Sequence, residues 1–256
     1  MDSKEKVNNY AKGFPIASLA FEGSVMKYGV PNNASLWRVS TFETKEPETI
    51  KWISSFKEGE VFFDVGANMG LYTIFAAVHK KVKVFAFEPE SQNYALLNRN
   101  IRLNDLADNV VAWCCALSNA FMVDRLYMRG LEVAQSGHEF GAEVDTALRP
   151  KKALFAQGSI SYKLDSLVES GAIPIPNHVK IDVDGIEHLV LEGAIKTFTD
   201  KKLRSVLIEI SPHISEHIEI CSKMKSLGFT FDSDQVERAR RKEGSTKNYA
   251  EYIFRR

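Results

Sequence analysis

Short apolar runs alternate with helical spacing of apolar residues along most of the chain. The runs predict strands at residues 61–65, 82–87, 110–116, 178–183, 203–210, 229–231 and 251–254. Between them, apolar residues recur every three or four positions, which predicts helices at residues 48–56, 71–80, 91–103, 186–193 and 215–227. Apolar strands that alternate with helices indicate a parallel sheet covered on both faces. We therefore expect an α/β protein with a mostly parallel seven-stranded sheet.

Two stretches depart from this alternation. The first 34 or so residues are interrupted by Pro15, Gly29 and Pro31, which predicts an irregular or helical segment. We place an N-terminal extension at residues 1–41 and the α/β domain at residues 42–256. Within that domain, residues 118–167 form an insertion with short strands at 125–128 and 161–164 and a polar loop around 135–143. Insertions of this kind usually cover a site, and we expect the same here.

Composition narrows the class of protein. Hydrophobic residues make up 45% of the 256 residues and charged residues 26%, as in ordinary globular proteins. The 33 basic residues equal the 33 acidic residues, so the net charge gives no general attraction to nucleic acid or to an anionic membrane. The polar N-terminus carries no signal segment, no run is long enough to span a bilayer, and the three cysteines form no CxxC pair. We expect a cytoplasmic protein with reduced thiols and no membrane partner; the oligomeric state stays open.

The strongest chemical signal is a glycine loop between the first strand and its helix. It reads Asp64-Val-Gly66-Ala-Asn68-Met-Gly70. Glycines allow a sharp turn and a close ligand approach, and the helix that follows presents backbone amides to polar groups. The GxNxG spacing differs from the GxGxxG of a dinucleotide fingerprint, and the Lys-Ser/Thr pair of a P-loop is missing.

Two acids define the ligand further. Asp64 precedes the loop, where its carboxylate suits an ammonium group, and Glu88 ends the second strand, where a carboxylate suits a ribose diol. Together they describe a nucleoside with a cationic amino-acid tail and no pyrophosphate. S-adenosylmethionine fits that description.

At this point a family resemblance is visible. FFDVGANMGLYTIFAA and VFAFEPESQNYALLNRNIRLN resemble the FkbM family of methyltransferases, as do EPETIKWISSF, SYKLDSL and VKIDVDGIEHLVLEGA. The similarity covers roughly residues 42–256 with order and spacing kept. It implies a class I methyltransferase fold, which is Rossmann-like, and O-methyl transfer to hydroxyls of sugars or natural products. One departure is Asp184, which stands where the family usually has glutamate in KIDVEG.

The charged residues of the VKIDVDG segment (179–185) also indicate a site without reference to the family. Lys180, Asp182 and Asp184 alternate with apolar residues along the predicted strand, so their side chains are expected on one side near its carboxyl end. We expect the two aspartates to orient or deprotonate an acceptor hydroxyl, with Lys180 tuning them. A structural Lys–Asp pair is the alternative. With Glu187, these acids could also hold magnesium or calcium, which is open but not favoured.

Three weaker signals remain. Ser118 follows the third strand, where class I enzymes contact the adenine, and we assign it to the cofactor site. His213 and His217 are four residues apart but lack the HExxH pattern, so a solvated helix face is favoured over zinc. The basic run at residues 238–242 predicts a solvated hairpin between the last two strands, with an anionic acceptor as the alternative.

Three functions are consistent with these features. A small-molecule or glycan O-methyltransferase is favoured. An RNA methyltransferase of the same fold is disfavoured by the zero net charge and by the absence of an NPPY-like motif after the fourth strand. A non-catalytic binding module is disfavoured by the intact Gly66, Asn68, Gly70 and Glu88. The acceptor itself is not defined by the sequence.

Overall fold

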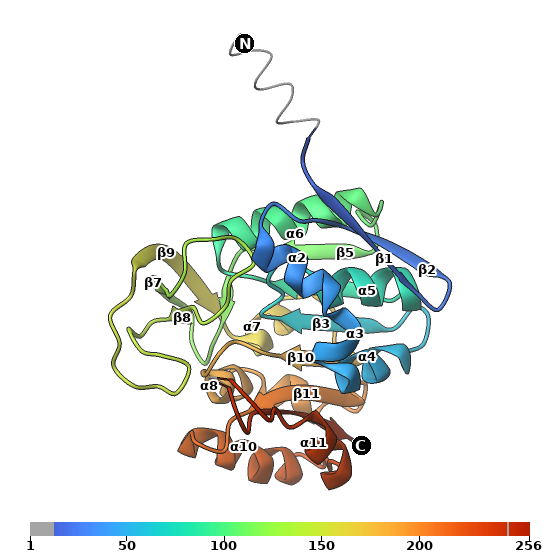
Figure 1. Ribbon diagram of the computed structural model, residues 1–256. Coiled ribbons are helices and arrows are strands. Elements are labelled where there is room, and N and C mark those ends of the chain that lie inside the picture. Colours follow the sequence, from blue (N-terminus) through green and yellow to red (C-terminus); the bar gives the residue numbers. More distant parts are fainter. Residues whose placement is uncertain (1–12, 245) are drawn as a thin grey trace.

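A six-stranded sheet forms the centre of the computed structural model, which describes residues 13–244 and 246–256 (Figure 1). The strand order is β12-β11-β10-β3-β4-β5, and all neighbours run parallel except β12, which pairs antiparallel with β11. The strands are β3 (Val61–Val65), β4 (Lys83–Phe87), β5 (Val110–Trp113), β10 (His178–Ile181), β11 (Ser205–Ile210) and β12 (Ala250–Arg255). The α/β class and the mostly parallel sheet are confirmed.

The prediction of a seventh strand at residues 229–231 was wrong. Only Thr230 makes a bridge there, to Arg255 at the end of β12. Immediately afterwards Asp232 accepts a hydrogen bond from Asp234 N (2.9 Å) and begins a helix, α11 (Ser233–Ala239). This helix cap takes the chain out of the extended conformation before a strand can form.

Helices cover both faces of the sheet, as predicted. The alternation along β3 shows why: Phe62 packs into one buried cluster, whereas Phe63 and Val65 pack into the other. On the first side lie α4 (Pro47–Ser54), α5 (Leu71–Lys80), α6 (Ser91–Leu103) and α11, and on the second side lie α7 (Leu164–Glu169), α8 (Glu187–Glu192), α9 (Ile195–Thr199) and α10 (Ser215–Ser226).

The described part of the N-terminal segment corrects the expectation of an irregular or helical extension. It forms an antiparallel hairpin, β1 (Ile16–Phe21) and β2 (Ser24–Gly29), followed by α2 (Asn33–Ser40) and α3 (Phe42–Lys45). Glu22 and Gly23 take positive φ values of 43° and 82°, which suit a two-residue hairpin turn. β2 packs against α5 and α6 and buries Met26 and Tyr28 completely. The prediction for residues 1–12 lies outside the described residues.

A second, four-stranded sheet of order β6-β9-β7-β8 lies beside the first, at the left of Figure 1. Its strands are β6 (Ala116–Leu117), β7 (Met122–Met128), β8 (Glu139–Phe140) and β9 (Phe155–Tyr162). The predicted strand at residues 110–116 is therefore divided between two sheets, because β5 ends at Trp113. The predicted strand at 125–128 lies within β7, while the one at 161–164 stops at Tyr162 and α7 begins two residues later.

No helix in the described ranges is both long and apolar enough to cross a bilayer.

Candidate active site

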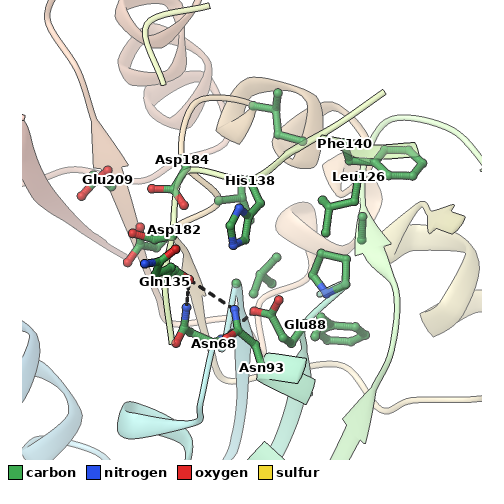
Figure 2. A pocket seen from close by; sticks show the side chains of 18 of the residues that line it. Asn68, Glu88, Asn93, Leu126, Gln135, His138, Phe140, Asp182, Asp184 and Glu209 are labelled. Carbon is green, nitrogen blue, oxygen red and sulfur yellow. Dashed lines mark hydrogen bonds between the residues drawn. The ribbon is translucent and has the colours of Figure 1, made fainter. Parts of the chain in front are cut away.

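The loops at the carboxyl ends of β3, β4, β10 and β11 surround a cavity of about 300 Å³. Open α/β sheets bind ligands at this edge. The cavity is lined from the central sheet by Gly66, Asn68, Glu88, Asp182 and Asp184, and Figure 2 shows several of these side chains directed toward its interior. Five of the residues predicted for the site therefore meet in one place.

The glycine loop brings two strand ends into contact. Gly66 has φ 81°, and a Cβ placed there would lie 1.9 Å from the backbone oxygen of Asp182. Any side chain at this position would force the loops after β3 and β10 apart. Gly70, with φ 82°, begins α5, and a Cβ there would lie 2.4 Å from Leu97 Cδ1 on α6. Gly66 is thus required by close backbone packing at the cavity, whereas Gly70 packs against α6 and is not part of the described lining of either cavity.

Asn68 connects the glycine loop to the insertion. Its φ is 52°, a conformation that asparagine tolerates better than most residues. Its side-chain amide donates to the backbone oxygen of Gln135 (2.7 Å), which is also within reach of the Asn93 amide (3.3 Å). Residues of the predicted insertion (Gln135, Ser136, His138 and Phe140) thereby line the same cavity.

Glu88 presents a carboxylate at the end of β4. It is 5% exposed and accepts hydrogen bonds from the backbone amides of Asn68 (2.7 Å) and Glu90 (2.8 Å). Burial raises its pKa to about 7, although the two amides act in the opposite direction. Each carboxylate oxygen keeps a further lone pair, so the group can still accept hydrogen bonds from a pair of hydroxyls.

Asp64 lines a second, smaller cavity of about 40 Å³, which Gly66 and Asn68 of the glycine loop also line. Its Oδ2 accepts a hydrogen bond from Thr73 (2.6 Å), whereas its buried Oδ1 has no hydrogen-bond partner among the described residues. Burial raises the pKa of Asp64, opposed by Lys180. An unpartnered buried carboxylate oxygen beside a cavity is suited to a ligand cation. Arg38, Lys45, Gly66, Asn68 and Asp182 line both cavities.

Lys180 and Asp182 form a tight ion pair beneath the loop. Lys180 Nζ donates to Asp182 Oδ2 at 2.6 Å, and the lysine is 2% exposed. Burial alone would lower the pKa of Lys180, but Asp182, Asp64 and Glu46 together raise it. Burial likewise opposes ionisation of Asp182, yet the nearby cations hold its pKa well below the usual range. Both groups are therefore charged at neutral pH.

Asp184 differs from Asp182 in its surroundings. It has φ 63° and accepts a hydrogen bond from Gly137 N (2.7 Å). Burial and the neighbouring Asp182 raise its pKa to about 6. The two aspartates do not alternate along a strand as predicted, because β10 ends at Ile181 and both lie in the loop that follows. That loop is held by Glu187, whose carboxylate accepts from Val183 N and Gly185 N (both 3.0 Å).

His217 corrects the expectation of a solvated helix face. It is 2% exposed, and its Nε2 lies 2.9 Å from both Glu187 Oε2 and the Gly185 oxygen. It therefore fixes the loop that carries Asp184. His213, four residues earlier, is exposed. Within the described ranges, no group of three or more His, Cys, Asp or Glu side chains has an arrangement suited to a metal ion.

Ser118 lies behind the cavity wall. Cys115, Ala116 and Leu117 line the cavity, whereas Ser118 is not part of the described lining. Its backbone oxygen would lie 2.1 Å from a Cβ on Gly193, so it packs closely against the end of α8.

Sequence reasoning missed several residues that line the large cavity: Trp37 and Arg38 from α2, His138, Glu209, Arg241 and Thr246. Arg241 lies in the basic run expected to be a solvated hairpin. Instead, Arg238 lies in the last turn of α11. Arg241 contacts the carboxylates of Glu209, Glu251 (2.9 Å) and Glu46 (3.5 Å). The basic run at residues 238–242 could have indicated a charged contact, but the acidic partners of Arg241 are distant in the sequence.

The central sheet and its covering helices have the fold of a class I methyltransferase. Comparison with known proteins identifies the family: residues 64–231 match the family described as "Methyltransferase FkbM domain". The chain belongs to the FkbM methyltransferase family and is an enzyme.

Relatives with assigned activities are moderately similar. The hexuronic acid methyltransferase AglP of Haloferax volcanii is 28% identical over 191 residues, which cover 73% of this chain and 71% of AglP. The 31-O-demethyl-FK506 methyltransferase FkbM of Streptomyces tacrolimicus is 28% identical over 201 residues, covering 70% of this chain and 76% of the relative. A crystal structure of the methyltransferase FkbM from Methylobacillus flagellatus KT aligns with a TM-score of 0.52 at 15% identity. That alignment covers 88% of this chain and 55% of the longer solved chain, and it supports the fold alone.

Proposed function

We propose that this protein is an S-adenosylmethionine-dependent O-methyltransferase that acts on a hydroxyl of a sugar or of a small natural product. The observation that carries the proposal is the pair of cavities joined by the Gly66–Asn68 loop. One cavity is lined by Asp64, whose Oδ1 has no partner within the described part of the chain, and the other by Glu88 and Asp184. Asp64 suits a cationic amino-acid tail, Glu88 suits a ribose diol, and Asp184 suits a reacting hydroxyl.

The residues present fit S-adenosylmethionine. Asp64 Oδ1 would accept from its ammonium group, and Arg38 or Lys45, which line the same small cavity, would face its carboxylate. Glu88 would accept hydrogen bonds from the ribose hydroxyls. Gly66 leaves the space that a Cβ would otherwise fill. When bound, the cofactor would supply a methyl group on a positively charged sulfur. The sulfur would leave as a neutral thioether, so no acid is needed to protonate the leaving group.

The chain must then align the acceptor and take its proton. Alignment alone is worth several kcal/mol in such displacements, roughly up to 7–11 kcal/mol in the best intramolecular cases. Asp184 is the better base, because its pKa of about 6 leaves it ionised at neutral pH and still able to take a proton. Asp182 is held as an anion by Lys180 and serves to keep the loop and the charge balance in place.

The class of acceptor comes from the relatives. AglP acts on a hexuronic acid and the Streptomyces enzyme on a demethylated FK506, and both names describe oxygen-rich molecules. Carboxylates, a histidine and a tryptophan around the large cavity suit a polyhydroxylated ligand.

The test is methyl transfer from S-adenosylmethionine labelled with carbon-13 in its methyl group. The acceptors are methyl glycosides of hexoses and hexuronic acids, an amino sugar and a short RNA. We expect label on a hydroxyl oxygen of a glycoside, located by NMR of the product. Label only on nitrogen, or only on RNA, would refute the proposal.

A further inference from the structure

His138 is a polar side chain in the large cavity that the proposed chemistry does not yet use. It lines the cavity together with Asp184, and Figure 2 shows its ring directed into the interior. The preceding residue, Gly137, donates a hydrogen bond from its backbone amide to Asp184 Oδ2 (2.7 Å). His138 is therefore bonded in sequence to a residue that contacts the proposed base.

His138 immediately precedes the short strand β8. β8 pairs antiparallel with β7, with Tyr127 opposite Glu139 and Leu126 opposite Phe140. Phe140 lines the cavity, as does His138 just before the strand, whereas Glu139 between them is buried and is not part of the described lining.

One ring nitrogen of His138 is already occupied. Arg129 donates its backbone amide to His138 Nδ1 at 3.2 Å. Nδ1 is therefore an acceptor, and the proton of the neutral ring is on Nε2. Nε2 has no hydrogen-bond partner among the described residues, and it is the nitrogen left to meet a ligand.

The charge of the ring follows from its neighbours. Burial lowers the pKa of His138, Arg129 and Arg38 lower it further, and Glu90 acts in the opposite direction. A lowered pKa favours the neutral imidazole at neutral pH. A neutral ring that carries its proton on Nε2 can donate a hydrogen bond there but cannot take up a proton at that atom.

We propose that His138 binds the methyl acceptor by donating a hydrogen bond from Nε2 to one of its oxygens, while Asp184 takes the proton of the reacting hydroxyl. This inference rests on the proposed O-methyltransferase function. In the transfer, the hydroxyl O–H bond breaks and its proton goes to Asp184, the new O–CH₃ bond forms, and the S–CH₃ bond breaks with its electron pair left on sulfur. His138 keeps its proton throughout. The acceptor must then offer a lone pair beside the reacting hydroxyl, as a vicinal diol or a hydroxy acid does.

The experiment compares wild type, His138→Gln and His138→Ala with the methyl glycosides named above. Glutamine keeps an N–H donor near the position of Nε2, so we expect its kcat/KM within about threefold of wild type. Alanine removes the donor, and we expect kcat/KM to fall about tenfold, mainly through KM. His213→Ala, at an exposed histidine, is the matched control and should be unchanged.

Three further readouts separate acceptor binding from other roles. Affinity for S-adenosylhomocysteine should be unchanged in both His138 variants, their melting temperatures should match wild type, and the acid limb of the pH profile near pH 6 should persist, because it belongs to Asp184. Nitrogen-15 NMR of wild type should show the Nε2–H tautomer.

Several results would overturn the inference. They are His138→Ala with wild-type kcat/KM, weakened S-adenosylhomocysteine binding, loss of the acid limb in His138→Gln, or an Nδ1–H tautomer. The tautomer measurement uses wild type, so it decides the matter even if His138→Ala fails to fold. Failure of the proposed function appears differently: wild type itself would then place label only on nitrogen or only on RNA, and the inference would fall with it.

Discussion

Replacing Glu88 with glutamine tests the ribose assignment while keeping the shape of the side chain. In the wild type, the carboxylate accepts from the Asn68 and Glu90 amides and has acceptor capacity left on both oxygens. A glutamine can offer only one oxygen, and its NH₂ group would face either a backbone amide or a ribose hydroxyl. We therefore expect the site to remain folded but to bind the nucleoside more weakly.

The magnitude follows from the kind of bond that is lost. Hydrogen bonds to a charged group contribute about 1.5–3 kcal/mol, which corresponds to a roughly 10- to 150-fold weaker Kd for S-adenosylhomocysteine. The wild-type affinity should also depend on pH. The pKa of Glu88 is about 7 in the free protein, and bound hydroxyls favour the ionised form. Affinity is thus fully present above pH 7 and falls by up to about tenfold for each pH unit below it.

Isothermal titration calorimetry between about pH 6 and pH 8 measures both effects. The matched control is Glu139→Gln: Glu139 is also buried with a raised pKa, but it is not part of the described cavity lining. Glu139→Gln should keep the wild-type Kd and its pH dependence, whereas Glu88→Gln should show a weaker and flatter profile. Equal affinity of wild type and Glu88→Gln across this range would refute the assignment.

Three other changes are expected to have distinct outcomes. Asp184→Asn should keep S-adenosylhomocysteine affinity but lower kcat at least about tenfold and remove the acid limb near pH 6. Asp182→Asn should instead lower stability by about 1–3 kcal/mol in urea unfolding, because it leaves Lys180 without its charged partner. Equal behaviour of the two variants would contradict the separate roles. Gly66→Ala should lower the melting temperature well beyond Gly171→Ala, since both sites have positive φ but only Gly66 would contact backbone, and similar melting temperatures would show that the loop can relax. Activity should survive dialysis against a chelator, and its loss with recovery on adding magnesium would show a metal role for the acids.

That the residues proposed for the cofactor lie close together could be predicted from the sequence. Asp64, Gly66, Asn68 and Glu88 belong to two consecutive strand–loop–helix units, and the short apolar strands before them define where the loops begin. Neighbouring parallel strands bring those loops to the same edge of the sheet, so local patterns were sufficient.

The acceptor side could not be predicted in the same way. His138, just before β8, and Arg241, after α11, line the cavity from segments outside the strand–loop–helix units that carry Asp64 and Glu88. The carboxylates that hold Arg241 are provided by residues 46, 209 and 251, and no local pattern links them to a basic run. The prediction that Asp184 continues the alternation along the strand was wrong, because β10 ends at Ile181 and Asp184 lies in the following loop with a positive φ.

The central claim is that this site binds S-adenosylmethionine, and titration of the purified protein with S-adenosylhomocysteine and, separately, with NAD tests it most directly. We expect saturable binding of S-adenosylhomocysteine with a rise in melting temperature, because a ligand that binds only the folded state stabilises it. We expect no response to NAD, since the glycine loop lacks the dinucleotide spacing. Tight binding of NAD together with no response to S-adenosylhomocysteine would contradict the account.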